Sequence, residues 1–114
     1  MMAAGEVLLG AVEQIPTGEG RTFRVGDVEI AVFHTAEGDV YATQALCPHR
    51  QGPLADGLLG GTTLMCPLHD RTFDLTSGCG TSHEHLGLVT YQARVIDGQI
   101  WLRPEPVQAQ AAAE

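Results

Sequence analysis

The sequence has few basic residues and no long apolar stretch, and both shortages exclude classes of protein. Lysine and arginine together number 6 against 14 aspartates and glutamates, so the formal net charge of the 114 residues is −8. Such a chain has no basic stripe to neutralise a phosphate backbone, which makes nucleic acid a poor candidate partner. No apolar run approaches the roughly 20 residues that cross a bilayer. Residues 1–10 also lack signal-peptide features, so we expect a cytoplasmic protein that does not bind membranes.

Aromatic residues are scarce as well, at 5% of the chain, whereas glycine and proline number 14 and 6. This composition favours short elements joined by tight turns over long helices. The length supports one domain that buries roughly two-thirds of the surface of its unfolded chain. No internal repeat or heptad pattern is present, so we expect a single all-β domain rather than a coiled coil or an array.

Alternating apolar residues predict antiparallel strands near both ends of the sequence. Gly26-Asp27 and Asp97-Gly98 each fit a two-residue hairpin turn, and Asp-Gly is the stronger signal because a type I′ turn needs positive φ at both central residues. In the strand that precedes Cys47, Val40, Ala42 and Gln44 are expected to share one face. The predicted strands span residues 7–10, 22–25, 28–34, 40–45, 88–96 and 99–103.

The middle of the sequence is rich in Gly, Pro, His and Cys, and only residues 62–65 and 72–75 resemble strands there. We therefore expect one domain over residues 1–103, with a base formed by residues 1–45 and 81–103 and an inserted functional lobe formed by residues 46–80. Residues 104–114 contain prolines and no apolar face, and are expected to form a disordered tail.

Three cysteines cannot form a closed set of disulfides, so metal ligation or free thiols are the expected uses. Two of them occur in short pairs, Cys47-Pro48-His49 and Cys66-Pro67-Leu68-His69, with 16 residues between the pairs. Each pair offers one thiolate and one imidazole in a tight loop. Two thiolates and two imidazoles suit tetrahedral zinc, although zinc modules usually take both cysteines from one loop. Mixed loops favour a two-iron cluster in which the cysteines hold one iron and the histidines hold the other.

These two motifs resemble the signature of the Rieske [2Fe-2S] family, and the likeness extends through Gly52-Pro53-Leu54, Gly57 and Phe73-Asp74-Leu75. The resemblance implies an all-β fold in which a Rieske-type β-sandwich base of antiparallel strands carries a smaller inserted cluster-binding lobe. It also implies one [2Fe-2S] cluster per chain. The implied ligands are Cys47, His49, Cys66 and His69.

The ligand set itself predicts the redox chemistry. Two ferric ions, two sulfides, two thiolates and two neutral imidazoles carry no net formal charge, so adding an electron is easier than with four thiolates. Histidine ligation accordingly raises potentials to about −150 to +300 mV, against roughly −400 mV for plant-type ferredoxins. High-potential members of the family have a disulfide where Gly52 and Leu68 stand here, and hydroxyl donors to cluster sulfur at the positions of Arg71 and Phe73. We therefore expect a potential at the low end of the Rieske range.

The chain resembles two kinds of Rieske protein that lack this disulfide and also lack a transmembrane anchor. The first is the small subunit of NAD(P)H-dependent nitrite reductase, which implies a flavoprotein or sirohaem-containing partner subunit. The alternative is the ferredoxin component of a bacterial aromatic-ring-hydroxylating dioxygenase. We expect an electron-transfer component with no catalytic residues of its own. A zinc-stabilised interaction module is the distant alternative.

Several residues have simpler interpretations than a role at the cluster. His34 is expected to be an ordinary strand histidine, and Trp101 a core residue of the base. Cys79 matches no ligand position and is expected to be a small structural thiol. His83 and His85 fit a polar surface loop, or a loop that lies beside the cluster lobe.

Overall fold

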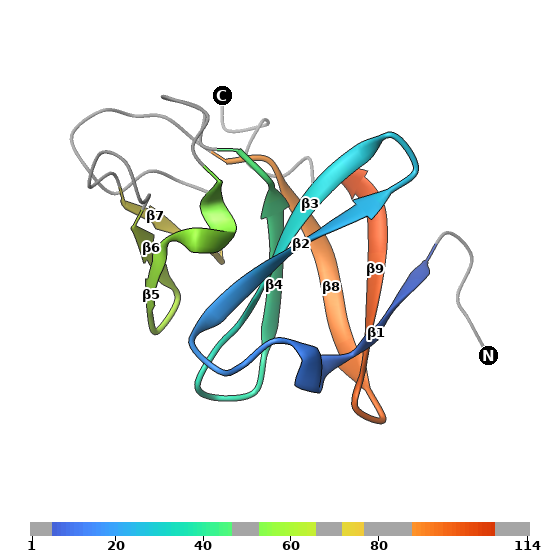
Figure 1. The fold of residues 1–114 in the computed structure, drawn as a ribbon, viewed down its shortest axis with the longest axis horizontal. Helices are drawn as coiled ribbons and strands as arrows, with labels where there is room; N and C mark the ends of the chain where they lie inside the picture. The colour runs from blue at the N-terminus through green and yellow to red at the C-terminus, as the bar shows by residue number, and fades with distance from the viewer. Residues whose placement is uncertain (1–5, 47–52, 66–71, 77–87, 107–114) are drawn as a thin grey trace.

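The computed structural model describes residues 6–46, 53–65, 72–76 and 88–106. Within these ranges the chain forms antiparallel strands and two short 3-10 turns, which confirms the all-β prediction (Figure 1). None of the helical segments described is long and apolar enough to span a membrane. The elements are β1 (Val7–Ala11), η1 (Val12–Gln14), β2 (Glu19–Val25), β3 (Val28–His34), β4 (Val40–Gln44), η2 (Leu54–Asp56), β5 (Leu58–Gly60), β6 (Thr63–Met65), β7 (Thr72–Asp74), β8 (Thr90–Ile96) and β9 (Gln99–Pro106).

Six strands form the larger sheet, in the order β1-β9-β8-β4-β3-β2. The sheet curves (Figure 1). Side chains from both of its edge strands pack against the same core. Leu9 of β1 and Phe23 of β2 both contact this core from opposite edges. We call its buried residues the base cluster: Ile15, Ile30, Val32, Val40, Ala42, Ile100 and Leu102.

Both predicted hairpin turns are present. Val25 pairs with Val28 across Gly26-Asp27, and Ile96 pairs with Gln99 across Asp97-Gly98. Asp97 has a φ of 54° and Gly98 a φ of 78°, so both central residues of the second turn adopt the positive φ that a type I′ turn requires.

The smaller sheet contains β5, β6 and β7 in that order, all antiparallel. Strands near residues 62–65 and 72–75 were predicted, whereas β5 was not. Its three residues are Leu58, Leu59 and Gly60, and the two adjacent leucines give the sequence no alternation of apolar and polar residues that would identify the strand.

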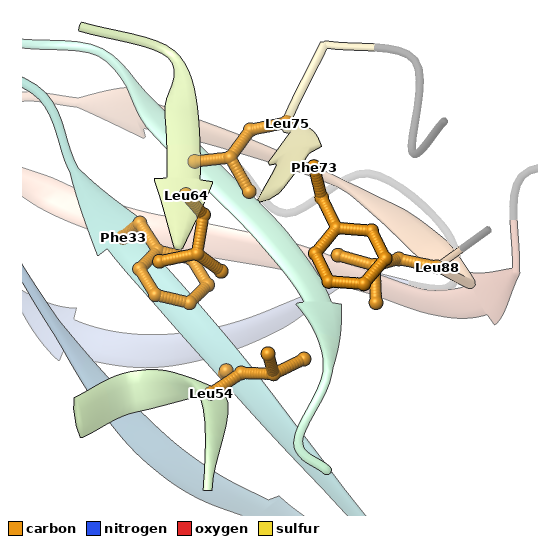
Figure 2. Packing of buried hydrophobic residues seen from close by; sticks show 7 residues of the cluster. Phe33, Leu54, Leu64, Phe73, Leu75 and Leu88 are labelled. Atoms are coloured by element: carbon orange, nitrogen blue, oxygen red, sulfur yellow. The ribbon is translucent and has the colours of Figure 1, made fainter. Parts of the chain in front are cut away.

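Strands β3 and β4 lie between two cores and bury residues on both faces. Along β3, Ile30 and Val32 enter the base cluster, whereas Ala31 and Phe33 enter a second core. This second core, the lobe cluster, joins β3 to the smaller sheet (Figure 2). It consists of Ala31, Phe33, Leu54, Leu64, Phe73, Leu75 and Leu88.

Two glycines allow close contacts beside the lobe cluster. A Cβ atom on Gly20 of β2 would lie 2.6 Å from a ring carbon of Phe33 and 3.3 Å from Cα of Ala55, so η2 can approach β2 only where a side chain is missing. A Cβ atom on Gly57 would collide with the carbonyl oxygen of Met65. These contacts fix η2 and β5 against the strands that they adjoin.

The C-terminal strand differs from the sequence-based expectations in two respects. Trp101 is only half-buried and belongs to neither cluster, so its prediction as a core residue was wrong. The alternation along β9 instead buries Ile100 and Leu102, which leaves Trp101 on the opposite face. Strand β9 also continues to Pro106, three residues into the expected tail. Residues 107–114 lie outside the described residues, and the expected base and lobe boundaries remain a prediction.

Candidate metal centre

The four predicted ligands lie outside the described residues, in two segments of six residues each. Cys47 and His49 belong to residues 47–52, the first ligand segment, and Cys66 and His69 belong to residues 66–71, the second ligand segment. The described residues that flank the two segments therefore define how the site is built.

Paired residues hold both ends of the first ligand segment. Strand β4 ends two residues before Leu46, which forms an antiparallel bridge with Pro53 on the far side of the segment. The backbone N–H of Leu54 donates to the carbonyl oxygen of Ala45 at 2.9 Å. The residues immediately before and after the first ligand segment therefore lie next to each other.

The second ligand segment connects two strands of the smaller sheet. Strand β6 ends at Met65 and β7 begins at Thr72, and these two residues are direct partners in the ladder. The segment is therefore the connection of a β-hairpin. Leu75 N–H donates to the carbonyl oxygen of Thr62 at 2.8 Å, which extends the pairing beyond the opposite end of the two strands.

The residues that flank the two segments meet in the lobe cluster. Leu54 follows the first segment, Leu64 precedes the second, and Phe73 follows the second (Figure 2). Each of these side chains is at most 1% exposed. Leu58, four residues after Leu54, also pairs with Met65, the residue before the second segment. One apolar core therefore anchors both segments that contain the predicted ligands.

The segment that follows the smaller sheet returns to the same region. Leu88 belongs to the lobe cluster, and the carbonyl oxygen of Val89 accepts a hydrogen bond from the backbone N–H of Gln44 at 2.8 Å. Cys79, His83 and His85 precede this return and lie outside the described residues. Their expected roles stay predictions.

Among the residues that the structure describes, no group of three or more His, Cys, Asp or Glu side chains is arranged to hold a metal ion. His34 lies at the end of β3, half-buried, with Nδ1 2.7 Å from the carbonyl oxygen of Ile15. This contact joins β3 to the connection before β2, as expected of an ordinary strand histidine. The predicted metal ligands all lie in the two ligand segments.

The described surroundings fit a two-iron cluster of the predicted type. The predicted donor set would offer two thiolates and two imidazoles from two segments whose flanking residues are paired, as mixed cysteine and histidine ligation requires. Phe73 is buried in the lobe cluster and has no hydroxyl group, so this position supplies no hydrogen bond to a cluster sulfur. Gly52, Leu68 and Arg71 lie outside the described residues.

One titratable side chain in the base has a shifted pKa. Burial raises the pKa of Tyr91, because the phenolate form is poorly solvated where the ring packs against the base cluster. Tyr91 lies on β8 opposite Ala42 of β4.

Three residues with a structural role at the site were not identified as such from the sequence. Gln44 uses its side-chain amide to join separate segments, and Gly20 and Gly57 permit close backbone contacts. A glutamine at a strand end has many partners available, so only the tertiary structure reveals its hydrogen bonds. Gly57 belongs to the motif that resembles the Rieske family, but nothing in the sequence indicates that it lies so close to Met65.

A family model of the Rieske [2Fe-2S] domain matches residues 5–92. The chain is 39% identical over 67 residues to the ferredoxin component of naphthalene 1,2-dioxygenase/salicylate 5-hydroxylase systems from Ralstonia sp, which covers 59% of this chain and 64% of that one. It is 31% identical over 103 residues to nitrite reductase [NAD(P)H] of Emericella nidulans, which covers 82% of this chain and 9% of the fungal protein. The chain thus spans less than two thirds of each of these curated relatives.

The fold is similar to that of solved Rieske proteins. The ferredoxin of carbazole 1,9a-dioxygenase from Nocardioides aromaticivorans IC177 superposes with a TM-score of 0.80 at 27% identity, covering 90% of this chain and 100% of that one. The chain belongs to the Rieske [2Fe-2S] domain family, whose members carry a two-iron, two-sulfide cluster and transfer electrons.

Proposed function

We propose that this chain carries one electron at a time between redox partners, with its cluster held by Cys47, His49, Cys66 and His69. The observation that supports this ligand set is the anchoring of both ligand segments. Leu46 bridges Pro53, and Met65 pairs with Thr72. Residues beside these pairs pack into one lobe cluster, so the same core flanks both segments that contain the proposed ligands.

The bound cluster would accept or donate one electron at a time. The residues around it influence its exposure to water and its reduction potential. Leu54, Leu64 and Phe73 keep water out of the core beneath the two ligand segments. Phe73 offers no hydroxyl, and hydrogen bonds to sulfur raise the potential of such clusters by stabilising the extra negative charge. The proposed carrier accordingly has a potential at the low end of the Rieske range.

The first candidate for the whole system is NAD(P)H-dependent nitrite reductase, with this chain as its small subunit. The alignment with the fungal nitrite reductase extends over 82% of this chain. The proposed partner is a flavoprotein or sirohaem-containing subunit of that system.

The second candidate is the ferredoxin component of an aromatic-ring-hydroxylating dioxygenase. Two findings favour it: the higher identity to the Ralstonia ferredoxin component and the superposition on the full length of the Nocardioides ferredoxin. In this system the partners are a reductase and an oxygenase.

Purification under anaerobic conditions tests the proposed ligand set. We expect two irons and two acid-labile sulfides per chain and a visible absorption that dithionite bleaches. Cys66→Ser and His69→Cys are expected to lose or alter this absorption, while the far-UV circular dichroism of the base strands persists. One zinc per chain without colour would refute the proposal, as would native spectra in both variants.

Reconstitution distinguishes the two candidate systems. The reduced protein is mixed in turn with a sirohaem-containing nitrite reductase subunit and with a terminal oxygenase, and its reoxidation is followed by visible absorption. Fast reoxidation by the nitrite reductase subunit in the presence of nitrite supports the first candidate. Fast reoxidation by the oxygenase, but not by the nitrite reductase subunit, supports the second candidate and rejects the first.

A further inference from the structure

The side-chain amide of Gln44 joins three parts of the chain beside the cluster site. Its Oε1 accepts a hydrogen bond from the backbone N–H of Val89 at 2.7 Å. Its Nε2 donates to the carbonyl oxygen of Leu46 at 2.7 Å. Gln44 itself is the last residue of β4. The end of β4, the residue before the first ligand segment and the residue before β8 are therefore tied to one amide group.

The hydrogen bond from Val89 to the Gln44 side chain takes the place of a backbone hydrogen bond between β8 and β4. Strands β4 and β8 pair at Ala42 with Tyr91 and at Thr43 with Thr90. At Gln44 the backbone N–H still donates to Val89, but the return bond from Val89 goes to the Gln44 side chain. The main-chain carbonyl of Gln44 accepts instead from the hydroxyl of Thr43, at 2.8 Å. Strand β4 can thus leave the sheet here while both backbone groups of Gln44 and the N–H of Val89 keep partners.

The second bond reaches the peptide unit that leads into the first ligand segment. A peptide unit is planar, so a bond that fixes the carbonyl of Leu46 also fixes the plane through which the chain enters residue 47. Leu46 is held from its other side by the bridge to Pro53. The entry to the segment is therefore set by one side chain and one bridge, with Leu46 itself 43% exposed and contributing little packing.

We propose that Gln44 is a positioning residue for the cluster, because it fixes the entry of the first ligand segment relative to β8. This inference rests on the proposed ligand set, since Cys47 is the residue that follows Leu46. The ligands of a metal centre depend on such outer contacts for their orientation, and the electronic properties of the centre change when the contacts are lost. The role needs a donor and an acceptor on one side chain, which an amide provides.

Two substitutions separate the two bonds. Gln44→Met keeps the length of the side chain and removes both bonds. Gln44→Glu keeps an acceptor for Val89, but an ionised carboxylate cannot donate to Leu46. Gln92 is exposed on β8 and provides matched controls, Gln92→Met and Gln92→Glu, of which the second adds the same charge to the same sheet. All four variants are compared for iron and sulfide content, melting temperature, reduction potential and the EPR spectrum of the reduced protein.

We expect both Gln44 variants to fold and bind two irons, with EPR g-values and a potential shifted from those of the wild type and of the Gln92 controls. The melting temperature should fall further in Gln44→Met than in Gln44→Glu, which keeps the bond to Val89. Loss of iron from a variant whose β-sheet circular dichroism is native also supports the role. Unchanged g-values and potential in Gln44→Met overturn it.

The remaining outcomes also decide the question. If Gln44→Met fails to fold, the spectra of Gln44→Glu decide instead. If neither variant folds, Gln44 only stabilises the sheet, and the inference is overturned. Cys47→Ser, measured in parallel, tests the ligand set independently. If Cys47→Ser retains the native spectrum, the proposed ligand set fails. If it loses the cluster while the Gln44 variants match the wild type, only the inference about Gln44 fails.

Discussion

Val32 and Phe33 are neighbours on β3, yet each is buried in a different core. Val32 lies in the base cluster and Phe33 in the lobe cluster, because successive side chains of a strand point to opposite faces. Strand β3 is therefore shared between the sheet that gives the domain its stability and the core that anchors the ligand segments. Substitutions in the two clusters should have separable effects.

Leu64→Ala and Leu102→Ala test this separation with the same chemical change. Both leucines are 0% exposed, Leu64 in the lobe cluster and Leu102 in the base cluster. Each substitution should reduce the free energy of unfolding by about 2–5 kcal/mol through lost burial and a residual cavity. Only Leu64→Ala should also accelerate loss of the visible absorption in the presence of an iron chelator. Equal rates of cluster loss in the two variants would contradict separate roles for the clusters.

Gly20→Ala should destabilise the protein by about 1–3 kcal/mol, because the new methyl group would overlap the ring of Phe33 and press on Ala55. Gly60→Ala is the control, since a Cβ atom at that position meets nothing within 4 Å. Urea unfolding followed by circular dichroism measures both. A loss for Gly60→Ala as large as that for Gly20→Ala would show that glycine itself, and not the close contact, is what matters.

Arg94→Ala should cost about 1–2 kcal/mol, because it leaves Glu6 without the partner that its carboxylate contacts at 2.7 Å. The side chain of Glu6 is only 7% exposed, although that of Arg94 is 53% exposed, which limits the effect. Arg24→Ala removes a second ion pair among the described residues, with Glu29 at 3.7 Å, in which both side chains are more than half exposed. Thermal unfolding should show a loss below about 1 kcal/mol for Arg24→Ala. The prediction fails if the two arginine variants melt alike.

Tyr91 should make the stability of the protein fall at alkaline pH. Its pKa is raised in the folded state by burial, so above the ordinary tyrosine value of 10.0 the unfolded chain loses its proton first. The stabilisation is complete below that pH and is lost as the pH rises through the folded-state pKa. The sequence contains no lysine, so few other groups titrate in this range.

Tyr91→Phe should therefore reduce the fall in melting temperature between pH 9 and pH 11, whereas Tyr41→Phe, at the other tyrosine, controls for removal of a hydroxyl. The melting temperature is measured by circular dichroism at each pH. An alkaline fall in Tyr91→Phe as steep as in the wild type would exclude Tyr91 as its cause.

Much of the fold was predictable because its signals are local. Alternation of apolar residues identified most strands of the larger sheet, and Asp97-Gly98 indicated a turn whose positive φ values the structure confirms. Strand β5 was missed because its three residues carry no alternating pattern, and its pairing with β6 supplies what the local sequence lacks. Trp101 was wrongly expected in the core, because the alternation along β9 buries its neighbours Ile100 and Leu102 instead.

The sequence by itself indicated the cofactor, because two Cys-His pairs in mixed loops favour a two-iron cluster and resemble the Rieske signature, and the family match confirms this type of cluster. Only the tertiary structure decided how the ligand segments are held. The bridge from Leu46 to Pro53, the pairing of Met65 with Thr72 and the amide bonds of Gln44 join residues that no local pattern relates. Ligand identity is a property of side-chain chemistry, whereas the anchoring of a loop depends on backbone groups that meet only when the two cores have formed.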